Sequence, residues 1–147
     1  MSVTNDQAES SLRGWLRANN YEVSKRREYG ENGVDILASR GREILHIEVI
    51  GYSSKPSKRA MDFFQAFFRA VSRLKDGANT CVIAMPAEYG RGLRQRAAKY
   101  GIAWKRIGET FPELSIWLVG CGTRKCSIQT FAWNDWLEQT TGNYLTN

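Results

Sequence analysis

Apolar positions recur at helical spacing in two stretches of the first half of the chain, residues 5–19 and 57–75. Three shorter runs between them carry the alternating or continuous apolar patterns that are typical of strands, and glycine-containing turns separate these runs. The three runs are residues 21–29, 34–39 and 43–52. Because turns of a few residues join antiparallel neighbours, we expect an antiparallel meander between the two helices.

The second half of the chain opens on a continuously apolar run, residues 80–85, which predicts a buried strand. A basic helix over 89–100 and a strand over 102–107 are expected next, with Gly101 at the end of the helix. A strand–helix–strand unit after a meander predicts a mixed sheet with helices on its faces. The expected order is αβββαβαβ, and the fold class is α/β in the broad sense that includes α+β.

The C-terminal part of the chain is less regular. Two strand-like runs, residues 114–119 and 127–131, are expected to pair as a hairpin, and a short helix follows over 134–140. We assign these elements to an extension over about residues 108–147, attached to a core over about residues 5–107. The chain of 147 residues fits a single domain over 1–147.

Composition is ordinary for a globular protein, with 42% hydrophobic and 24% charged residues. No apolar run approaches the roughly 18 residues that span a bilayer. The polar N-terminus shows no signal-peptide core. We therefore expect a cytoplasmic protein without membrane association.

A net charge of +6 favours polyanionic partners. The basic excess gathers in residues 55–75 and 89–106. Such charges are either solvated helix faces or a surface that faces phosphates, and we carry both interpretations forward. The nucleic-acid-binding candidates are Lys55, Lys58, Arg59, Arg69, Arg91, Arg94, Arg96 and Lys99.

Three cysteines, Cys81, Cys121 and Cys126, make an odd count without the framework of a disulfide-built secreted domain. Two thiols and one distant histidine do not make a zinc site. We expect ordinary reduced cysteines.

Two carboxylates stand out on neighbouring strand-like runs, Asp35 and Glu48. Side chains alternate along a strand, so His46, Glu48 and Ile50 share one face. An acid within an apolar strand needs compensation, because burying an unpaired carboxylate is costly. A divalent metal such as Mg²⁺, which prefers carboxylate oxygens, is one form of compensation. The alternative is that both acids pair with arginines at a sheet edge.

In this order of elements the chain resembles the PD-(D/E)XK nuclease superfamily, the restriction-endonuclease-like fold with its αβββαβ core. The resemblance covers roughly residues 5–107 and includes Gly33-Val34-Asp35 on the second strand and Glu48 on the third. Glu9 on the first helix matches an acid that many members place there. Gln65 and the segment Gly101-Ile102-Ala103-Trp104 are similar to the Mrr-like and Holliday-junction-resolvase-like branches.

The resemblance implies metal-dependent cleavage of phosphodiesters, most naturally in DNA. Asp35 and Glu48 would bind Mg²⁺ or Mn²⁺. Glu9 would hold a second metal or orient a water. Gln65 would position the scissile phosphate or the attacking water.

The chain departs from the family at Ile50, where members carry a catalytic lysine. Either another group takes over that role, with Lys55, Lys58, Lys25 and His46 as candidates, or the site has degenerated. In the second case the fold survives as a module that binds nucleic acid or a protein partner.

A homodimer is a further expectation, because cutting both strands of a duplex usually takes two sites. The Phe-rich helix and the tryptophans of the tail are the candidate interfaces. The alternative is that these aromatics fill the core.

Overall fold

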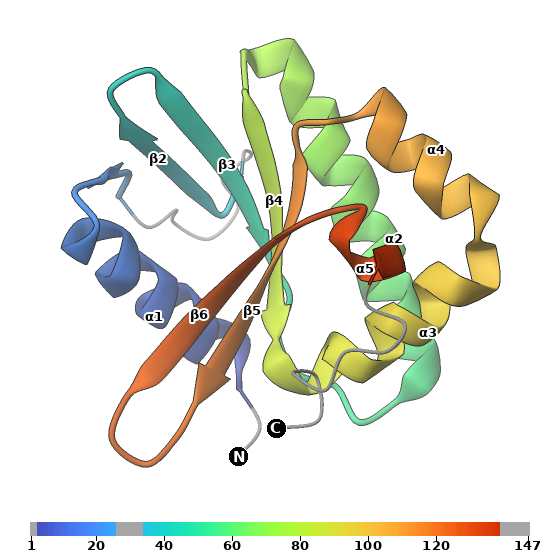
Figure 1. The fold of residues 1–147 in the computed structure, drawn as a ribbon. Helices are drawn as coiled ribbons and strands as arrows, with labels where there is room; N and C mark the ends of the chain where they lie inside the picture. The colour runs from blue at the N-terminus through green and yellow to red at the C-terminus, as the bar shows by residue number, and fades with distance from the viewer. Residues whose placement is uncertain (1–2, 26–33, 139–147) are drawn as a thin grey trace.

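The computed structural model describes residues 3–25 and 34–138. It is an α+β fold in which helices cover both faces of a mixed sheet (Figure 1). The helices are α1 (Asn5–Ala18), α2 (Pro56–Ser72), α3 (Gly90–Tyr100), α4 (Ile102–Thr110) and α5 (Asp135–Glu138). The strands are β1 (Glu22–Val23), β2 (Ile36–Arg40), β3 (Glu43–Val49), β4 (Thr80–Pro86), β5 (Leu114–Cys121) and β6 (Cys126–Ala132).

The six strands follow one another across the sheet in chain order. β1, β2 and β3 pair antiparallel, β3, β4 and β5 pair parallel, and β5 and β6 pair antiparallel. The predicted meander and the mixed sheet are therefore confirmed. The connections from β3 to β4 and from β4 to β5 each lead to the next parallel strand in the same direction across the sheet. Two right-handed connections of this kind place their helices on the same face of the sheet. Helices α2 to α5 lie on that face, while α1 covers the other (Figure 1).

Helix α1 covers the face of the sheet opposite to α2–α5. Leu12 and Leu16 are fully buried against strand residues such as Ile47, and Trp15 meets Trp117 edge-on at 5.4 Å between ring centroids. The helix begins with a capping box at Thr4, whose hydroxyl accepts from the Gln7 N–H. Asn5 and Asp6, whose side chains are also of the type that caps helices, lie in the first turn.

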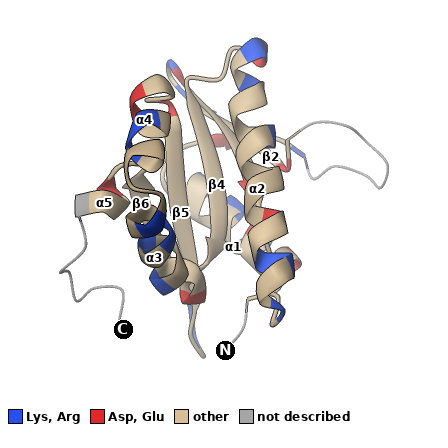
Figure 2. Ribbon diagram, turned by 90° about the vertical axis from the view of Figure 1, so that its right-hand side faces the viewer, with Lys and Arg blue, Asp and Glu red and all other residues tan. Residues whose placement is uncertain are grey.

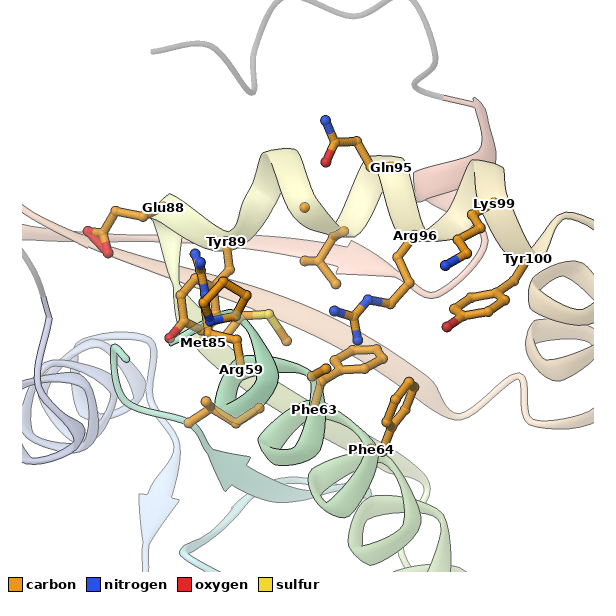
Figure 3. Close-up of a pocket in the computed structure, with 15 residues that line it drawn as sticks. Arg59, Phe63, Phe64, Met85, Glu88, Tyr89, Gln95, Arg96, Lys99 and Tyr100 are labelled. Carbon is orange, nitrogen blue, oxygen red and sulfur yellow. The ribbon is translucent and has the colours of Figure 1, made fainter. Parts of the chain in front are cut away.

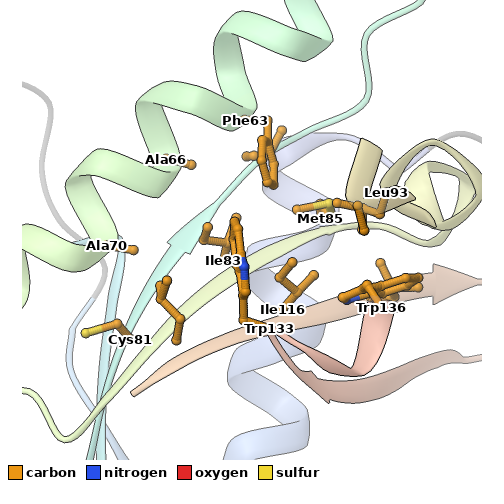
Figure 4. Packing of buried hydrophobic residues seen from close by; sticks show 14 of the residues in the cluster. Phe63, Ala66, Ala70, Cys81, Ile83, Met85, Leu93, Ile116, Trp133 and Trp136 are labelled. Atoms are coloured by element: carbon orange, nitrogen blue, oxygen red, sulfur yellow. The ribbon is translucent and has the colours of Figure 1, made fainter. Parts of the chain in front are cut away.

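Helix α2 buries a narrower face than its sequence pattern indicates. Phe63, Ala66 and Ala70 point into the core, whereas Phe64 is 48% exposed and Phe68 is 72% exposed. Figure 4 shows Phe63 and the two alanines facing Met85 and Trp133. The expectation that both outer phenylalanines belong to the inner face was wrong, since one helix on a sheet buries a limited stripe.

The strand predicted over 102–107 is a helix, α4. Gly101, at φ 50° and ψ −110°, ends α3 and lets the chain turn directly into α4. Ile102 is 70% exposed and Trp104 is 2% exposed, as on a helix with one buried side. The parallel strand that follows β4 in the sheet is therefore β5, which the sequence analysis assigned to a C-terminal extension.

The aromatic core ties this second half together. Trp104 and Trp133 stack at 4.0 Å, and each indole N–H donates to the backbone carbonyl of the other residue. Trp133 and Trp136 are 2% and 0% exposed, so the tryptophans fill the core and offer no interface.

The cysteine expectation was wrong for two of the three residues. Cys121 and Cys126 form a disulfide, because the β5–β6 register sets them opposite each other beside the turn of the hairpin. Cys81 is a buried free thiol. Disulfides are rare in reducing compartments, so the cysteines no longer argue against an oxidising one.

Two remaining expectations concern the ends of elements. The glycine-rich turn over 30–33 and the end of the helix over 134–140 lie outside the described residues. Within the described part of the chain, no helix combines the length and apolarity that crossing a membrane requires.

Candidate functional site

Asp35 and Glu48 lie at the same end of the β2–β3 pair. Asp35 directly precedes β2, and Glu48 is the last residue but one of β3. Ile36 pairs with Ile47, so one further step in the same register sets Asp35 opposite Glu48. Both residues line a cavity of about 180 Å³, which we call the carboxylate cavity. Its lining is completed by Asn5, Val49, Ile50, Lys58, Asp62, Gln65, Ala66 and Arg69.

The Asp35 carboxylate is fixed by the end of β3. The Val49 N–H donates to Asp35 Oδ2 at 2.8 Å. The backbone carbonyl of Asp35 accepts from the Arg13 guanidinium at 3.2 Å, which joins this residue to helix α1. A carboxylate held at both its side chain and its backbone is preorganised for a ligand in the cavity.

Glu48 is 4% exposed, so its charge requires compensation. Arg73 supplies part of it, with Nε at 3.5 Å from Glu48 Oε1. That distance makes an ion pair but exceeds good hydrogen-bond geometry. Arg73 also lies 3.4 Å from Asp76, so its charge is divided between two acids.

The polar side of α2 faces the carboxylate cavity. Lys58, Asp62, Gln65 and Arg69 recur every three or four residues, which places them on one side of the helix. Lys58 Nζ contacts Asp62 Oδ2 at 2.7 Å, and its side chain remains 60% exposed. The ammonium group is therefore held beside the cavity while keeping room to move.

Ile50 occupies the position, two residues after Glu48, at which the resemblance predicts a lysine. Its side chain is 6% exposed and packs in the core that contains Phe63, Ala66 and Met85. This position therefore brings no positive charge to the cavity. The cations that line it, Lys58 and Arg69, come from α2.

Four of the sequence candidates do not line the cavity: Glu9, Lys25, His46 and Lys55. Glu9 is buried in an ion pair with Arg13, with 3.0 Å between Oε2 and Nε, and Arg13 in turn donates to the carbonyls of Ser24 and Asp35. Arg13 thereby links Glu9 to the backbone of Asp35.

His46 lies in the middle of β3, two residues before Glu48 and on the same face of the strand, but it does not line the cavity. It is 6% exposed, and burial lowers the pKa of its imidazole; Asp76 opposes this effect to a smaller extent, and Arg73 adds slightly to it. Its Nδ1 atom has no hydrogen-bond partner among the described residues. An imidazole in this position is a core residue of the β3–β4 pair, where it sits opposite Cys81.

A second, larger cavity of about 450 Å³ lies between α2 and α3, and sequence reasoning missed it. We call it the α2–α3 groove, defined by Arg59, Phe63, Phe64, Arg96, Lys99 and Tyr100 (Figure 3). The Arg96 guanidinium stands over the Phe63 and Phe64 rings at 4.9 and 5.3 Å. The basic pattern of the α3 sequence pointed towards such a surface, but the aromatic half was assigned to the core.

Tyr89 fixes the inner end of the groove. Its hydroxyl accepts from the Ser53 N–H at 2.6 Å and donates to the Gly51 carbonyl at 3.2 Å. It thereby joins the segment that follows β4 to the segment that follows β3. Arg59 stands 5.8 Å from the Tyr89 ring centroid.

The basic candidates divide among three locations on the helical face (Figure 2). Lys58 and Arg69 line the carboxylate cavity. Arg59, Arg96 and Lys99 line the α2–α3 groove. Lys55, Arg91 and Arg94 belong to neither lining.

No family model matches this chain, and no curated protein matches it. The site therefore has to be interpreted from its own chemistry.

The donor set of the carboxylate cavity fits one Mg²⁺ ion. This ion typically takes one or two protein carboxylates and completes its octahedron with water and substrate phosphate. Asp35 and Glu48 supply two carboxylates from adjacent strands, and Gln65 adds an amide. Within residues 3–25 and 34–138, no group of three or more His, Cys, Asp or Glu side chains is placed to enclose a metal ion. An open site is expected for an ion that also has to bind substrate.

Proposed function

We propose that this protein is a Mg²⁺-dependent nuclease of the PD-(D/E)XK type that cleaves DNA, with Mn²⁺ as an alternative ion. The observation that carries the proposal is the shared lining of one cavity by Asp35 and Glu48 from the strands and by Lys58 and Gln65 from α2. Acids, an amide and a cation on one cavity are what phosphodiester cleavage requires.

In this proposal Asp35 and Glu48 hold the ion, which when bound supplies activation of water and neutralisation of charge on the phosphate. The Val49 N–H keeps Asp35 oriented towards the cavity. Gln65 offers an amide N–H to a phosphate oxygen. Arg69 adds a positive charge on the same side of the helix.

Lys58 takes the role that Ile50 cannot fill. Its ammonium group approaches the cavity from α2, and Asp62 holds it there at 2.7 Å. A cation in that position stabilises the negative charge that develops in the transition state. His46 and Glu9 have no direct part in this arrangement.

A second function is favoured by one specific observation, the pairing of charges around the cavity. Arg73 approaches Glu48 and Lys58 approaches Asp62, so the site is partly neutralised by the protein itself. Together with Ile50, this pairing is what a catalytically degenerate module that binds DNA or a protein partner would show.

The homodimer also stays a proposal, now resting on α2 alone. Met61, Phe64 and Phe68 are 60%, 48% and 72% exposed, at a spacing of three and four residues. Light scattering across a range of protein concentrations decides it, and a constant monomer mass would exclude it.

Calorimetry with Mg²⁺ and Mn²⁺ tests the nuclease proposal, with cleavage of plasmid and branched DNA measured on the same samples. The variants are Asp35→Asn, Glu48→Gln and Lys58→Met, and Lys55→Met is the matched control because Lys55 does not line the cavity. We expect Asp35→Asn and Glu48→Gln to abolish metal binding and cleavage. Lys58→Met should keep metal binding and lower the cleavage rate by roughly 100-fold, the scale of one lost charge-stabilising group.

Unchanged cleavage in Lys58→Met would exclude Lys58 as the replacement for the missing lysine. Absence of metal binding and of cleavage in the unmodified protein would reject the nuclease, and DNA binding that remains would then support the degenerate module.

A further inference from the structure

The α2–α3 groove combines flat aromatic surface with positive charge. Phe64 and Tyr100 are 48% and 42% exposed, and three cations, Arg59, Arg96 and Lys99, stand among the rings (Figure 3). Glu88 is the one acid among the residues that line the groove.

We propose that the α2–α3 groove binds unpaired nucleotides of a DNA strand, so that the substrate of this protein carries a single-stranded segment. The inference deepens the proposed function, on which its substrate role rests, by naming the form of DNA that reaches the carboxylate cavity. The binding itself needs no metal and is tested separately.

Aromatic side chains with exposed faces suit bases that are not paired. Every base has a π-face, so stacking on Phe64 or Tyr100 holds a strand without sequence preference. Paired bases in a duplex present only their edges. A cavity of about 450 Å³ holds about one or two nucleotides, the volume of a small ligand.

Arg96 provides the polar contact of the groove. Its Nη1 atom is buried and has no hydrogen-bond partner among the described residues, although a buried donor normally finds one. Phe63 and Phe64 hold the guanidinium plane in place. A phosphate in the groove would be attracted by the charge of this guanidinium, and Arg59 and Lys99 offer further charge to the same strand.

The groove and the carboxylate cavity are neighbours, with the buried side chain of Ile50 between them. Ile50 lines both, and the neighbouring residues Lys58 and Arg59 line one each. A strand whose unpaired nucleotides occupy the groove therefore crosses the first turns of α2 and presents its next phosphate to Asp35 and Glu48.

Fluorescence anisotropy with labelled oligothymidylate, and with a duplex of equal length, tests the proposal in the presence of EDTA. We expect oligothymidylate to bind at least tenfold more tightly than the duplex. Phe64→Ala should weaken that binding by roughly 5- to 150-fold, the range of stacking one base on an aromatic ring. Phe68→Ala is the matched control, an exposed phenylalanine one turn along α2 that does not line the groove. All proteins are titrated at a concentration at which light scattering gives a monomer mass, because Phe64 and Phe68 both lie on the proposed dimer face.

Equal binding of the two DNA forms, or equal losses in Phe64→Ala and Phe68→Ala, would overturn the proposal. Circular dichroism checks that each variant is folded, and Tyr100→Ala gives a second measurement at a half-exposed ring. The Asp35→Asn variant should bind oligothymidylate as the unmodified protein does. Selective binding of oligothymidylate without DNA cleavage would reject the nuclease proposal and support the groove proposal. Cleavage together with equal binding of both DNA forms would support the nuclease and reject the groove proposal.

Discussion

Ile50 decides how charge is distributed around both cavities. An apolar side chain at this strand position packs beneath α2 with Phe63 and Met85 and separates the carboxylate cavity from the α2–α3 groove. Cations then have to come from the helix, where Lys58 and Arg59 turn in different directions. With an apolar residue directly after β3, the cations that line the two cavities come from α2 and α3.

Glu88 should oppose DNA in the groove, and its effect should depend on pH. Burial raises the pKa of the Glu88 carboxyl, so it ionises at a higher pH than an ordinary glutamate. At about pH 3.5, below the pKa of even an ordinary glutamate, the side chain is largely neutral, and Glu88→Gln should bind oligothymidylate as the unmodified protein does. At about pH 8 the variant should bind roughly threefold more tightly, the effect of one charge about 7 Å from a phosphate in water.

Anisotropy titrations of both proteins across this pH range measure the difference. A gain in Glu88→Gln that is the same at both ends of the range would contradict this prediction, because Glu88 would then act through shape and not through charge.

Cys81 should be inert in the folded protein. It is 1% exposed, and burial raises the pKa of its thiol to about 11, so almost no thiolate forms near neutral pH. A thiol-reactive chromogenic disulfide should therefore detect no thiol in the native protein. It should detect one after unfolding, and three after unfolding and reduction, since the chain holds three cysteines. Three thiols without reduction would show that Cys121 and Cys126 are not joined.

At the scale of elements, Trp104 connects α4 to the chain beyond β6 through two indole–carbonyl hydrogen bonds. Trp104→Phe keeps an aromatic ring but loses one donor, and we expect a loss of about 1–2 kcal/mol in the free energy of unfolding. Trp104→Ala should cost about 3–5 kcal/mol, as for other large core residues. Urea unfolding monitored by far-ultraviolet circular dichroism gives these values.

Ile102→Ala is the control for this element. On helix α4 its side chain is 70% exposed, so the substitution should change the stability by less than about 0.5 kcal/mol. In a strand, Ile102 and Trp104 would share a face, and both substitutions would be costly. A large effect of Ile102→Ala would therefore restore the strand over 102–107.

This element shows where sequence patterns reach their limit. The runs over 34–39, 43–52 and 80–85 were correctly predicted as strands, because alternation and short glycine turns restrict their pairing. The run over 102–107 has too few residues to separate a strand from a helix by period. Only the packing of Trp104 on Trp133, far along the chain, decides between them.

The candidate site divides in the same way. Strand alternation places Asp35 and Glu48 towards each other, and helical spacing places Lys58 beside Gln65. The ion pair of Glu9 with Arg13 joins residues four apart on α1, so helical spacing also predicts it. The exclusion of His46 from the cavity lining depends on tertiary contacts that strand alternation does not encode. The groove depends on the approach of two helices, which no local pattern of either helix reveals.

At the scale of the whole molecule, both cavities lie at the carboxyl ends of parallel strands. β3 and β4 run in the same direction, so Ile50 after β3 and Tyr89 after β4 lie at the same end of these strands and line one groove. Open sheets with parallel strands usually bind ligands at the carboxyl ends of the strands. The hydrogen bonds from Tyr89 to the segment after β3 hold the two ends in a fixed relation.

The salt dependence of DNA binding should report how much of the basic surface is used. The chain carries a net charge of +6, but three cations line the groove, Arg59, Arg96 and Lys99. Neutralising about three phosphates of a single strand gives a slope of about −2 for log K against log salt concentration. Binding spread over the wider basic face would give a steeper slope.

Substitutions locate the contacts behind this slope. Arg59→Met should make it shallower by about 0.7, the contribution of one phosphate contact on a single strand. Arg91→Met should leave it unchanged, because Arg91 is exposed at the start of α3 and does not line the groove. The reverse pattern, a slope that responds to Arg91 and not to Arg59, would mean that DNA follows the outer surface of α3. The single strand would then have to reach Asp35 and Glu48 without passing over the first turns of α2, a route that the shared lining at Ile50 does not offer.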